Sequence, residues 1–298
     1  MNDASWSLVT VRADAAEQAA VLRADGTVVG LPDALAAPGV FALLERWDEV
    51  EPALRAFDPA RAPELAGAMP LTPVRFPRKL ICAGANYGDH LVEMKVGDVP
   101  DPLEPYFFLL PPSTTMIGSG EAIRIPADPS WRVDWEAELA VVIGRGGRGI
   151  AAADARHHVA GYAPFNDISA RGRHKRADPL APPFTFDWLG SKGADTFCPM
   201  GPGVVPDFLV DDPLDLSIKC WINGELEQDG TTKSMINDAW RLIEAISAYV
   251  TLEPGDVIAT GTPAGVGAPR GLQLAPGDEV AVEIEGLGRL VNPVVARD

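Results

Sequence analysis

Short apolar runs separated by glycine, proline and aspartate dominate the chain from residue 76 onward, and this texture most constrains the fold. Runs of this length fit buried strands, because helices need longer segments with a period of about 3.6 residues. Segment 234–250, SMINDAWRLIEAISAYV, has apolar side chains at that spacing and is predicted to be a helix packed on a sheet. We therefore expect an α+β fold that is mainly β.

The first 75 residues differ from the rest. Three short strand-like segments lie within residues 5–30, joined by turns such as Asp25-Gly26. Leucines and alanines at helical spacing follow, interrupted by prolines. The proline-rich stretch 59–77 is typical of a linker. The sequence thus predicts a small N-terminal α/β domain and linker over residues 1–75 and a larger domain over residues 76–298.

Charge and composition exclude several classes of function. The 298 residues include 25 basic and 42 acidic side chains, a net charge of −17, which argues against nucleic acid or an anionic membrane as partner. No apolar run approaches the roughly 20 residues of a membrane helix, and the N-terminal residues do not resemble a secretory signal. Three widely spaced cysteines fit a reducing cytoplasm, where we expect the protein.

Two glutamates, Glu136 and Glu138, stand one residue apart at the start of the apolar run DWEAELAVVIG. In a strand, residues two apart point to the same face, so these carboxylates would lie side by side. Either the pair is solvated, or the two groups share a divalent cation, which prefers oxygen ligands. Asp167, in GYAPFNDISARG, would complete a three-carboxylate metal site, although Asn-Asp alone equally indicates a turn or a helix N-cap.

His90 and Glu93, in NYGDHLVEM, are three residues apart and would share one face of a helix. The carboxylate could then orient the imidazole as a general base for water, whereas the alternative is an ordinary surface histidine. Lys192, in SKGADTFCPMGP, could neutralise a carboxylate or an enolate, although most lysines are simply solvated. His157 and His158 resemble exposed helix residues and are assigned no role.

Five segments, in this order, resemble signatures of the fumarylacetoacetate hydrolase family: NYGDHLVEM, DWEAELAVVIG, GYAPFNDISARG, SKGADTFCPMGP and TGTPAGVG. They cover the chain from about residue 80 to the end. The resemblance implies that Glu136, Glu138 and Asp167 hold Mg²⁺ or Mn²⁺, with Ca²⁺ as a further candidate. It also implies a mixed β-roll behind a small N-terminal domain, assembled as a homodimer.

The same resemblance implies roles for further residues. His90 and Glu93 match an acid/base pair on a mobile lid over residues 90–105, Lys192 matches the active-site lysine, and Thr262 matches a residue that binds the substrate carboxylate. These parts predict a hydrolase that cleaves a C–C bond in a β-diketone or acylpyruvate-like oxo acid through a metal-stabilised enolate. A decarboxylase or keto–enol isomerase on the same chemistry is the alternative, and a binding protein without turnover is a third possibility.

The chain departs from the family pattern at three positions that bear on the substrate. Leu110 stands where many members carry lysine, Ala85 where acylpyruvate-cleaving members can carry arginine, and His174 where glutamine is common. His174 is assigned to substrate binding. The loss of two cations predicts a distal pocket that prefers an apolar group to a second carboxylate, beside three aromatic residues, Phe184, Phe186 and Trp188. The alternative is that Leu110 and Ala85 lie in the core and the aromatic segment is a dimer contact.

Overall fold

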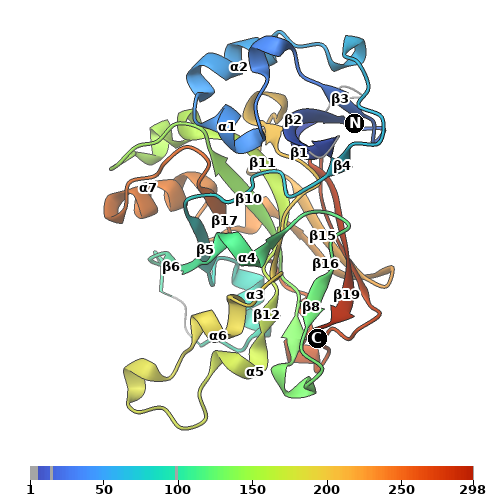
Figure 1. The fold of residues 1–298 in the computed structure, drawn as a ribbon. Coiled ribbons are helices and arrows are strands. Elements are labelled where there is room, and N and C mark those ends of the chain that lie inside the picture. Colours follow the sequence, from blue (N-terminus) through green and yellow to red (C-terminus); the bar gives the residue numbers. More distant parts are fainter. Residues whose placement is uncertain (1–5, 14–15, 98–99, 298) are drawn as a thin grey trace.

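The computed structural model describes residues 6–13, 16–97 and 100–297 and contains more strand than helix (Figure 1). The chain forms an N-terminal part with its own sheet and a larger part built from two sheets. The predicted α+β class with a predominance of strand is therefore confirmed. No helix within the described ranges is long and apolar enough to cross a bilayer.

The N-terminal part is an antiparallel four-stranded sheet in the order β3-β2-β1-β4 with two short helices. Its elements are β1 (Trp6–Ala13), β2 (Ala16–Arg23), β3 (Val28–Gly30), α1 (Val40–Leu44), α2 (Trp47–Arg55) and β4 (Met69–Pro70). The stretch 59–77 is not a free linker as predicted, because Pro70 pairs with Val11 and Glu64 bridges to Val29. Backbone pairing thus ties this proline-rich segment to the N-terminal sheet.

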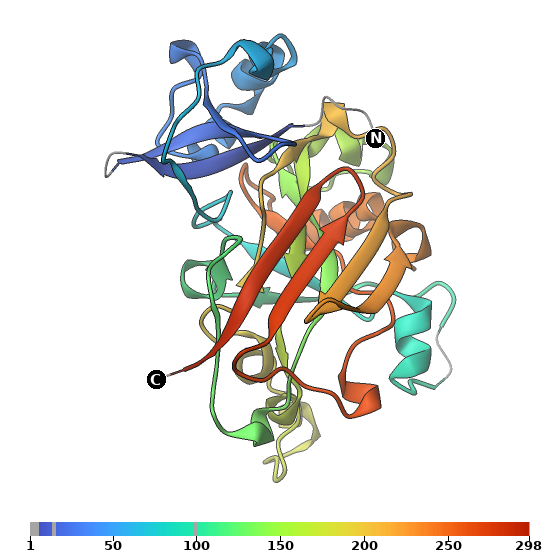
Figure 2. The ribbon, with the colours of Figure 1, turned by 90° about the vertical axis from the view of Figure 1, so that its right-hand side faces the viewer.

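The larger part contains a six-stranded and a five-stranded sheet, both mixed. The six-stranded sheet has the order β14-β11-β10-β17-β5-β6, and β17 and β5 run parallel. Its strands are β5 (Leu80–Gly84), β6 (Tyr106–Leu110), β10 (Ala137–Ile143), β11 (Val159–Asn166), β14 (Val205–Pro206) and β17 (Val257–Ala259). The five-stranded sheet has the order β16-β15-β18-β19-β8, with β19 and β8 parallel, and faces the viewer in Figure 2. It comprises β8 (Ile123–Ile125), β15 (Ser217–Ile222), β16 (Glu225–Thr231), β18 (Glu279–Ile284) and β19 (Gly288–Ala296).

Short strand pairs and short helices complete the larger part. The pairs are β9 (Val133–Asp134) with β12 (Ser169–Ala170), and β7 (Met116–Ile117) with β13 (Cys198–Pro199). The helices are α3 (Gly88–Glu93), α4 (Pro112–Thr115), α5 (Arg171–His174), α6 (Trp188–Lys192) and α7 (Ala239–Tyr249). The helix predicted from residue 234 begins only at Ala239, because the Asp238 side chain accepts the Arg241 N–H at 2.9 Å and caps the first turn.

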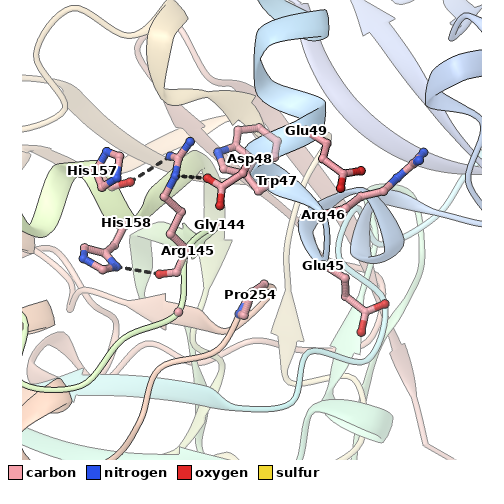
Figure 3. A pocket seen from close by; sticks show the side chains of 11 residues that line it. Glu45, Arg46, Trp47, Asp48, Glu49, Gly144, Arg145, His157, His158 and Pro254 are labelled. Carbon is pink, nitrogen blue, oxygen red and sulfur yellow. Dashed lines mark hydrogen bonds and ion pairs between the residues drawn. The ribbon is translucent and has the colours of Figure 1, made fainter.

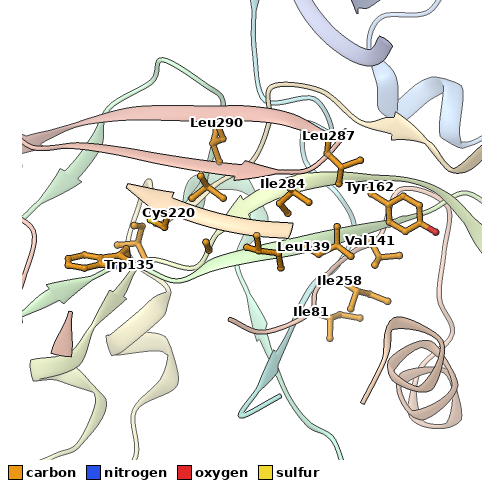
Figure 4. Close-up of a cluster of buried hydrophobic side chains, with 14 of the residues drawn as sticks. Ile81, Trp135, Leu139, Val141, Tyr162, Cys220, Ile258, Ile284, Leu287 and Leu290 are labelled. Carbon is orange, nitrogen blue, oxygen red and sulfur yellow. The ribbon is translucent and has the colours of Figure 1, made fainter. Parts of the chain in front are cut away.

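Strand β10 lies between two hydrophobic cores. Leu139 and Val141 face the core between the two large sheets, where Figure 4 shows them near Ile284. Ala140 and Val142 belong to a second core, which also contains side chains of the N-terminal part. This alternation is the period of two expected for a strand that is buried on both faces. Because Glu138 has the same parity as Ala140, it faces away from the core between the sheets.

Candidate active site

Three carboxylates meet where β10 begins and β11 ends. Ala137 pairs with Asn166, and the Asp167 N–H donates to the Glu136 carbonyl at 2.9 Å. This register places oxygen atoms of Glu136, Glu138 and Asp167 within 4.8 Å of one another. The side chains are 5%, 1% and 1% exposed, so the alternative of a solvated acidic pair is wrong.

Two cations neutralise part of this charge. Lys192, the last residue of α6, donates from Nζ to Glu136 Oε2 at 2.7 Å and to Asp167 Oδ2 at 2.5 Å. Arg171 Nη2 forms an ion pair with Glu136 Oε1 at 2.6 Å. Glu138 instead accepts the Gly261 N–H at 2.8 Å. The cluster therefore retains acidic groups that these cations do not fully compensate.

The three carboxyl groups have very different proton affinities. Burial opposes ionisation of Glu136, but the charges of Lys192 and Arg171 outweigh it and lower its pKa to about 2. Burial raises the pKa of Asp167 to about 6 despite Lys192. Burial, followed by the charges of Asp167 and Glu136, raises the pKa of Glu138 well above its ordinary value. In the absence of a further positive charge, burial and the neighbouring carboxylates therefore favour the protonated form of Glu138.

The cluster fits a hard divalent cation. All three donors are carboxylate oxygens, the set that Mg²⁺ and Mn²⁺ prefer. Asp167 Oδ1 is buried and has no hydrogen-bond partner among the described residues. An unpartnered buried oxygen is costly unless a ligand satisfies it, and a cation would also hold the like charges together. Glu136, Glu138 and Asp167 are therefore the residues that would hold the metal.

A histidine–glutamate pair lies on the short helix α3. His90 Nδ1 is 2.8 Å from Glu93 Oε1, and Glu93 Oε2 accepts the Gly265 N–H at 3.0 Å. Burial alone would raise the pKa of Glu93, but the hydrogen bonds from His90 and the Gly265 backbone lower it below its ordinary value. Glu93 is thus an anchored carboxylate that orients the ring of His90. Nε2 is the ring nitrogen left for proton transfer.

The pair and the carboxylates line one cavity of about 550 Å³. Every residue predicted for the site contributes to its lining: His90, Glu93, Glu136, Glu138, Asp167, His174, Lys192 and Thr262. These residues come from positions up to 172 apart in the chain and from separate elements, so the fold brings the whole predicted set together. A histidine held by a carboxylate, a lysine and a carboxylate cluster that fits a metal are together the groups needed to move a proton next to a polarised carbonyl group.

The hydroxyl of Thr262 is already engaged within the protein. It donates to the Ala137 carbonyl at 2.8 Å and accepts from Gln228 Nε2 at 2.8 Å. Gln228 also accepts the Ala137 N–H at 3.0 Å, so these residues lock the Thr262 loop onto the first residue of β10. The hydroxyl hydrogen is not available to a substrate carboxylate in this arrangement. Its observed contacts fix the loop beside the cluster.

An aromatic wall borders the cavity near His174. Trp188 stacks on Phe108 at a centroid distance of 4.7 Å and lies edge-on to His174 at 4.6 Å. Burial, then the charges of Arg171 and Lys192, lowers the pKa of His174 below its ordinary value. The ring is therefore neutral at neutral pH. His174 can offer hydrogen bonding and ring contacts to a ligand, and no charge.

Several premises of the predicted apolar distal pocket are wrong. Leu110 is 3% exposed and belongs to the core, as the alternative reading had it, whereas Ala85 lines the cavity. Phe184 and Phe186 are more than half exposed and do not line the cavity. A linear pattern could not show this, because strand pairing of Leu110 with Leu80 decides its burial.

Sequence reasoning missed Asp134 and Arg171. Asp134 is fully buried and accepts the Gly267 N–H at 2.7 Å, the Ala268 N–H at 3.0 Å and Arg171 Nε at 3.0 Å. It therefore connects the arginine beside Glu136 to the glycine-rich loop that contacts Glu93. Both residues stand inside motifs already quoted, DWE and SAR, but their pairing across 37 positions is a product of the fold.

A second cavity, of about 510 Å³, lies between α2 and the end of β10 (Figure 3). Arg145 lines it and forms ion pairs with Asp48 at 2.6 Å and Glu51 at 2.5 Å. His158 Nδ1 is held 2.8 Å from the Arg145 carbonyl. These contacts hold the two parts of the molecule together. None of the predicted site residues lines this second cavity. The two cavities are similar in size, so their lining residues, and not their volumes, distinguish the candidate active site.

Comparisons with known proteins agree with this geometry. Residues 79–295 match the fumarylacetoacetate (FAA) hydrolase C-terminal family. Protein Rv2993c of Mycobacterium tuberculosis is 40% identical over 275 residues, which cover 90% of this chain and 97% of that protein. The human mitochondrial oxaloacetate tautomerase FAHD2A is 45% identical over 227 residues, covering 76% of this chain and 69% of that protein.

Solved structures share the whole architecture. Fumarylacetoacetate hydrolase from Exiguobacterium antarcticum superimposes with a TM-score of 0.80 at 33% identity, covering 98% of this chain and 100% of that one. Maleylpyruvate hydrolase from Sphingobium sp. SYK-6, in complex with manganese(II) and pyruvate, gives a TM-score of 0.79 at 29% identity with the same coverage. Proteins similar to this chain thus include hydrolases and a tautomerase.

Proposed function

Because the chain belongs to the fumarylacetoacetate hydrolase family, we propose that it is a divalent-metal-dependent enzyme that converts a 2-oxo acid through its enol or enolate. One observation carries this proposal: the His90–Glu93 pair lines the same cavity as the Glu136–Glu138–Asp167 cluster. Glu136, Glu138 and Asp167 would hold Mg²⁺ or Mn²⁺. When bound, the ion would supply Lewis-acid stabilisation of negative charge on the oxo group.

The residues of the chain would move the proton. Glu93 holds His90 through Nδ1, so Nε2 can accept a proton from carbon or water and return it. Lys192 places a positive charge beside Glu136 and Asp167, next to the position where negative charge develops. Trp188 and Phe108 cover one side of the cavity with apolar surface and limit access of water there.

Keto–enol tautomerisation of a small oxo acid is the reaction that we favour. This reaction needs one acid/base group beside a cation that polarises the substrate carbonyl. The cavity contains His90 and the carboxylates that would hold such a cation. The chain is 45% identical over 227 residues to a protein named oxaloacetate tautomerase, whereas the two hydrolases of known structure are 33% and 29% identical over 98% of the chain. Hydrolytic C–C cleavage of an acylpyruvate-like acid is the second candidate, because the same pair could activate a water molecule.

Assays on the metal-loaded protein separate tautomerisation, hydrolysis and decarboxylation. A tautomerase accelerates the loss of enol ultraviolet absorbance from freshly dissolved enol-oxaloacetate, and NMR shows that the carbon skeleton is unchanged. A hydrolase instead releases pyruvate and a second acid from fumarylpyruvate or acetylpyruvate. Release of carbon dioxide from oxaloacetate would indicate a decarboxylase. Failure to accelerate any of these reactions with Mg²⁺ or Mn²⁺ would contradict the proposal.

A further inference from the structure

Basic side chains in the cavity differ in whether they have anionic partners. Lys192 and Arg171 are committed to the carboxylate cluster and to Asp134. Arg132 also lines the cavity, yet it has no ion pair or side-chain hydrogen bond with any residue in the described ranges. Arg132 is exposed, so its guanidinium is free to meet a ligand in a cavity whose lining also includes four carboxylates.

The backbone of Arg132 is held in place beside the cluster. Its φ of 47° lies in the left-handed region at the end of a 3₁₀ turn (Pro129–Trp131), and its N–H donates to the Pro129 carbonyl at 3.1 Å. Its carbonyl accepts the Arg171 N–H at 3.1 Å. The following residue, Val133, pairs with Ala170. Arg132 therefore projects from a fixed point near the metal-ligating strand.

Lys95 also lines the cavity and forms no ion pair among the described residues, but it follows α3 on the predicted lid, and an ammonium group binds a carboxylate as a point charge without the planar fork of arginine. The other polar groups of the lining do not offer a free positive charge. His174 is neutral at neutral pH, and the Thr262 hydroxyl is engaged by Ala137 and Gln228. Trp188 is covered by Phe108 on one face and meets His174 at its edge. Outside the predicted lid, Arg132 is thus the cavity residue best suited to bind a second carboxylate of a ligand. A guanidinium binds a carboxylate through two parallel hydrogen bonds.

We propose that Arg132 is the residue that binds the distal carboxylate of a dicarboxylic 2-oxo acid and so sets a preference for such acids over monocarboxylic ones. This inference rests on the proposed function, in which the 2-oxo carboxylate end lies at the cluster. It reverses the preference for an apolar distal group predicted from the sequence. Arg132 is a specificity-determining residue in this proposal and takes no part in proton transfer.

The test is ligand binding to the Mn²⁺-loaded protein, measured by calorimetry without turnover. The probes are two matched pairs of acids, 2-oxoglutarate with 2-oxopentanoate and 2-oxoadipate with 2-oxohexanoate, so that chain length is varied separately from charge. In each pair a carboxylate replaces a methyl group. We expect the wild-type protein to bind at least one dicarboxylate about tenfold or more tightly than its monocarboxylate partner, equivalent to roughly 1.4 kcal/mol.

Arg132→Gln should remove this preference, mainly by weakening the dicarboxylate about tenfold, and should change monocarboxylate and Mn²⁺ affinity less than about twofold. Arg132→Lys should retain part of the preference, because charge remains without the planar fork. Arg148→Gln is the matched control: it removes an exposed arginine that does not line the cavity, with the same change in net charge.

The outcomes distinguish the two levels of the proposal. Equal affinity for both members of each pair, or an equal loss of both in Arg132→Gln, would overturn the role of Arg132 while leaving the metal-dependent oxo acid site intact. A wild-type preference for the monocarboxylates would do the same. Absence of Mn²⁺-dependent binding of all four acids would contradict the proposed function and this inference with it.

Discussion

At the scale of single residues, the site holds three buried carboxyl groups that differ in how far nearby cations compensate them. Lys192 and Arg171 balance Glu136, whereas the acidity of Glu138 is suppressed by burial and by the neighbouring carboxylates Asp167 and Glu136. A carboxyl group whose pKa is raised by folding contributes stability below its ordinary pKa of 4.5, and that contribution is lost as the pH rises through the folded-state pKa. The metal-free protein should therefore lose stability as the pH rises from the ordinary pKa of 4.5 through the folded-state pKa of Glu138.

Glu138→Gln separates stability from metal binding. The amide oxygen can still accept the Gly261 N–H, and the substitution removes one buried acid. At pH 7 with a chelator, we expect the variant to have a Tm equal to or higher than that of the parent, whereas Mn²⁺ affinity falls by more than about tenfold, or roughly 1.4 kcal/mol. Thermal unfolding and calorimetry measure the two quantities. A lower Tm in chelator with unchanged Mn²⁺ affinity would show that Glu138 is structural.

His90 should affect turnover more than binding. Because Glu93 orients its ring for proton transfer, His90→Ala should lower kcat by roughly 10² to 10⁴-fold while KM changes little. Glu93→Gln should lower kcat less, since the ring remains. His157→Ala is a suitable control, because that histidine is exposed on a 3₁₀ segment away from the cavity. Steady-state kinetics with enol-oxaloacetate decides the matter, and a His90→Ala enzyme with parental kcat would refute the assignment.

At the scale of elements, α3 is a short helix whose position over the cavity depends on few polar contacts. The Glu93–Gly265 hydrogen bond joins it to the glycine-rich loop, and Leu91 is its buried residue. Val92, Met94 and Val96 are exposed. The predicted lid, residues 90–105, includes two positions, 98 and 99, outside the described residues, and its mobility stays a prediction.

Hydrogen exchange tests the lid. Amides of residues 88–97 should gain protection when Mn²⁺ and oxalate are added, because ligand contacts would hold α3 against the cavity. Peptides from β10 serve as the reference, since that strand is buried on both faces and should be protected in either state. Equal exchange of 88–97 with and without ligand would mean that α3 is not a lid.

At the scale of the whole molecule, the N-terminal part and the larger part share a core. Leu8 and Val204 exchange two backbone hydrogen bonds of 2.8 Å, and Trp47 packs so closely on Gly144 that a Cβ there would lie 2.6 Å from its ring. Trp47 is 3% exposed and lies in the same hydrophobic cluster as Val142 of β10. The two parts should therefore unfold together.

Trp47→Ala measures this coupling. Loss of a buried tryptophan should lower the free energy of unfolding by about 3 to 5 kcal/mol. Denaturant unfolding followed by circular dichroism and by Mn²⁺-dependent ligand binding should give coincident single transitions in both proteins, because the shared core links the N-terminal part to the site. Leu226→Ala, at a half-exposed position, is the control and should change stability little. Two separate transitions in the parent would contradict a shared core.

Much of the site was predictable from local pattern. The spacing of two residues at the start of β10 brings Glu136, which directly precedes the strand, beside Glu138, and the helical spacing of His90 and Glu93 allows their hydrogen bond. These relations span a few residues, so backbone geometry alone decides them. The residues themselves made Asp167 and Lys192 candidates, the resemblance of five ordered motifs assigned both of them and Thr262 to one site, and all three line one cavity.

The charge balance and the lining of that cavity were decided by the tertiary structure. Asp134 accepts a hydrogen bond from Arg171, 37 positions away in the sequence. Leu110 is buried where its strand pairs with Leu80. Arg132, at the end of a 3₁₀ turn, lines the cavity. Such neighbours depend on sheet order and register, which bring distant segments together. A linear pattern specifies the direction of each side chain relative to its own strand or helix, but only the packed sheets determine which charge it meets there.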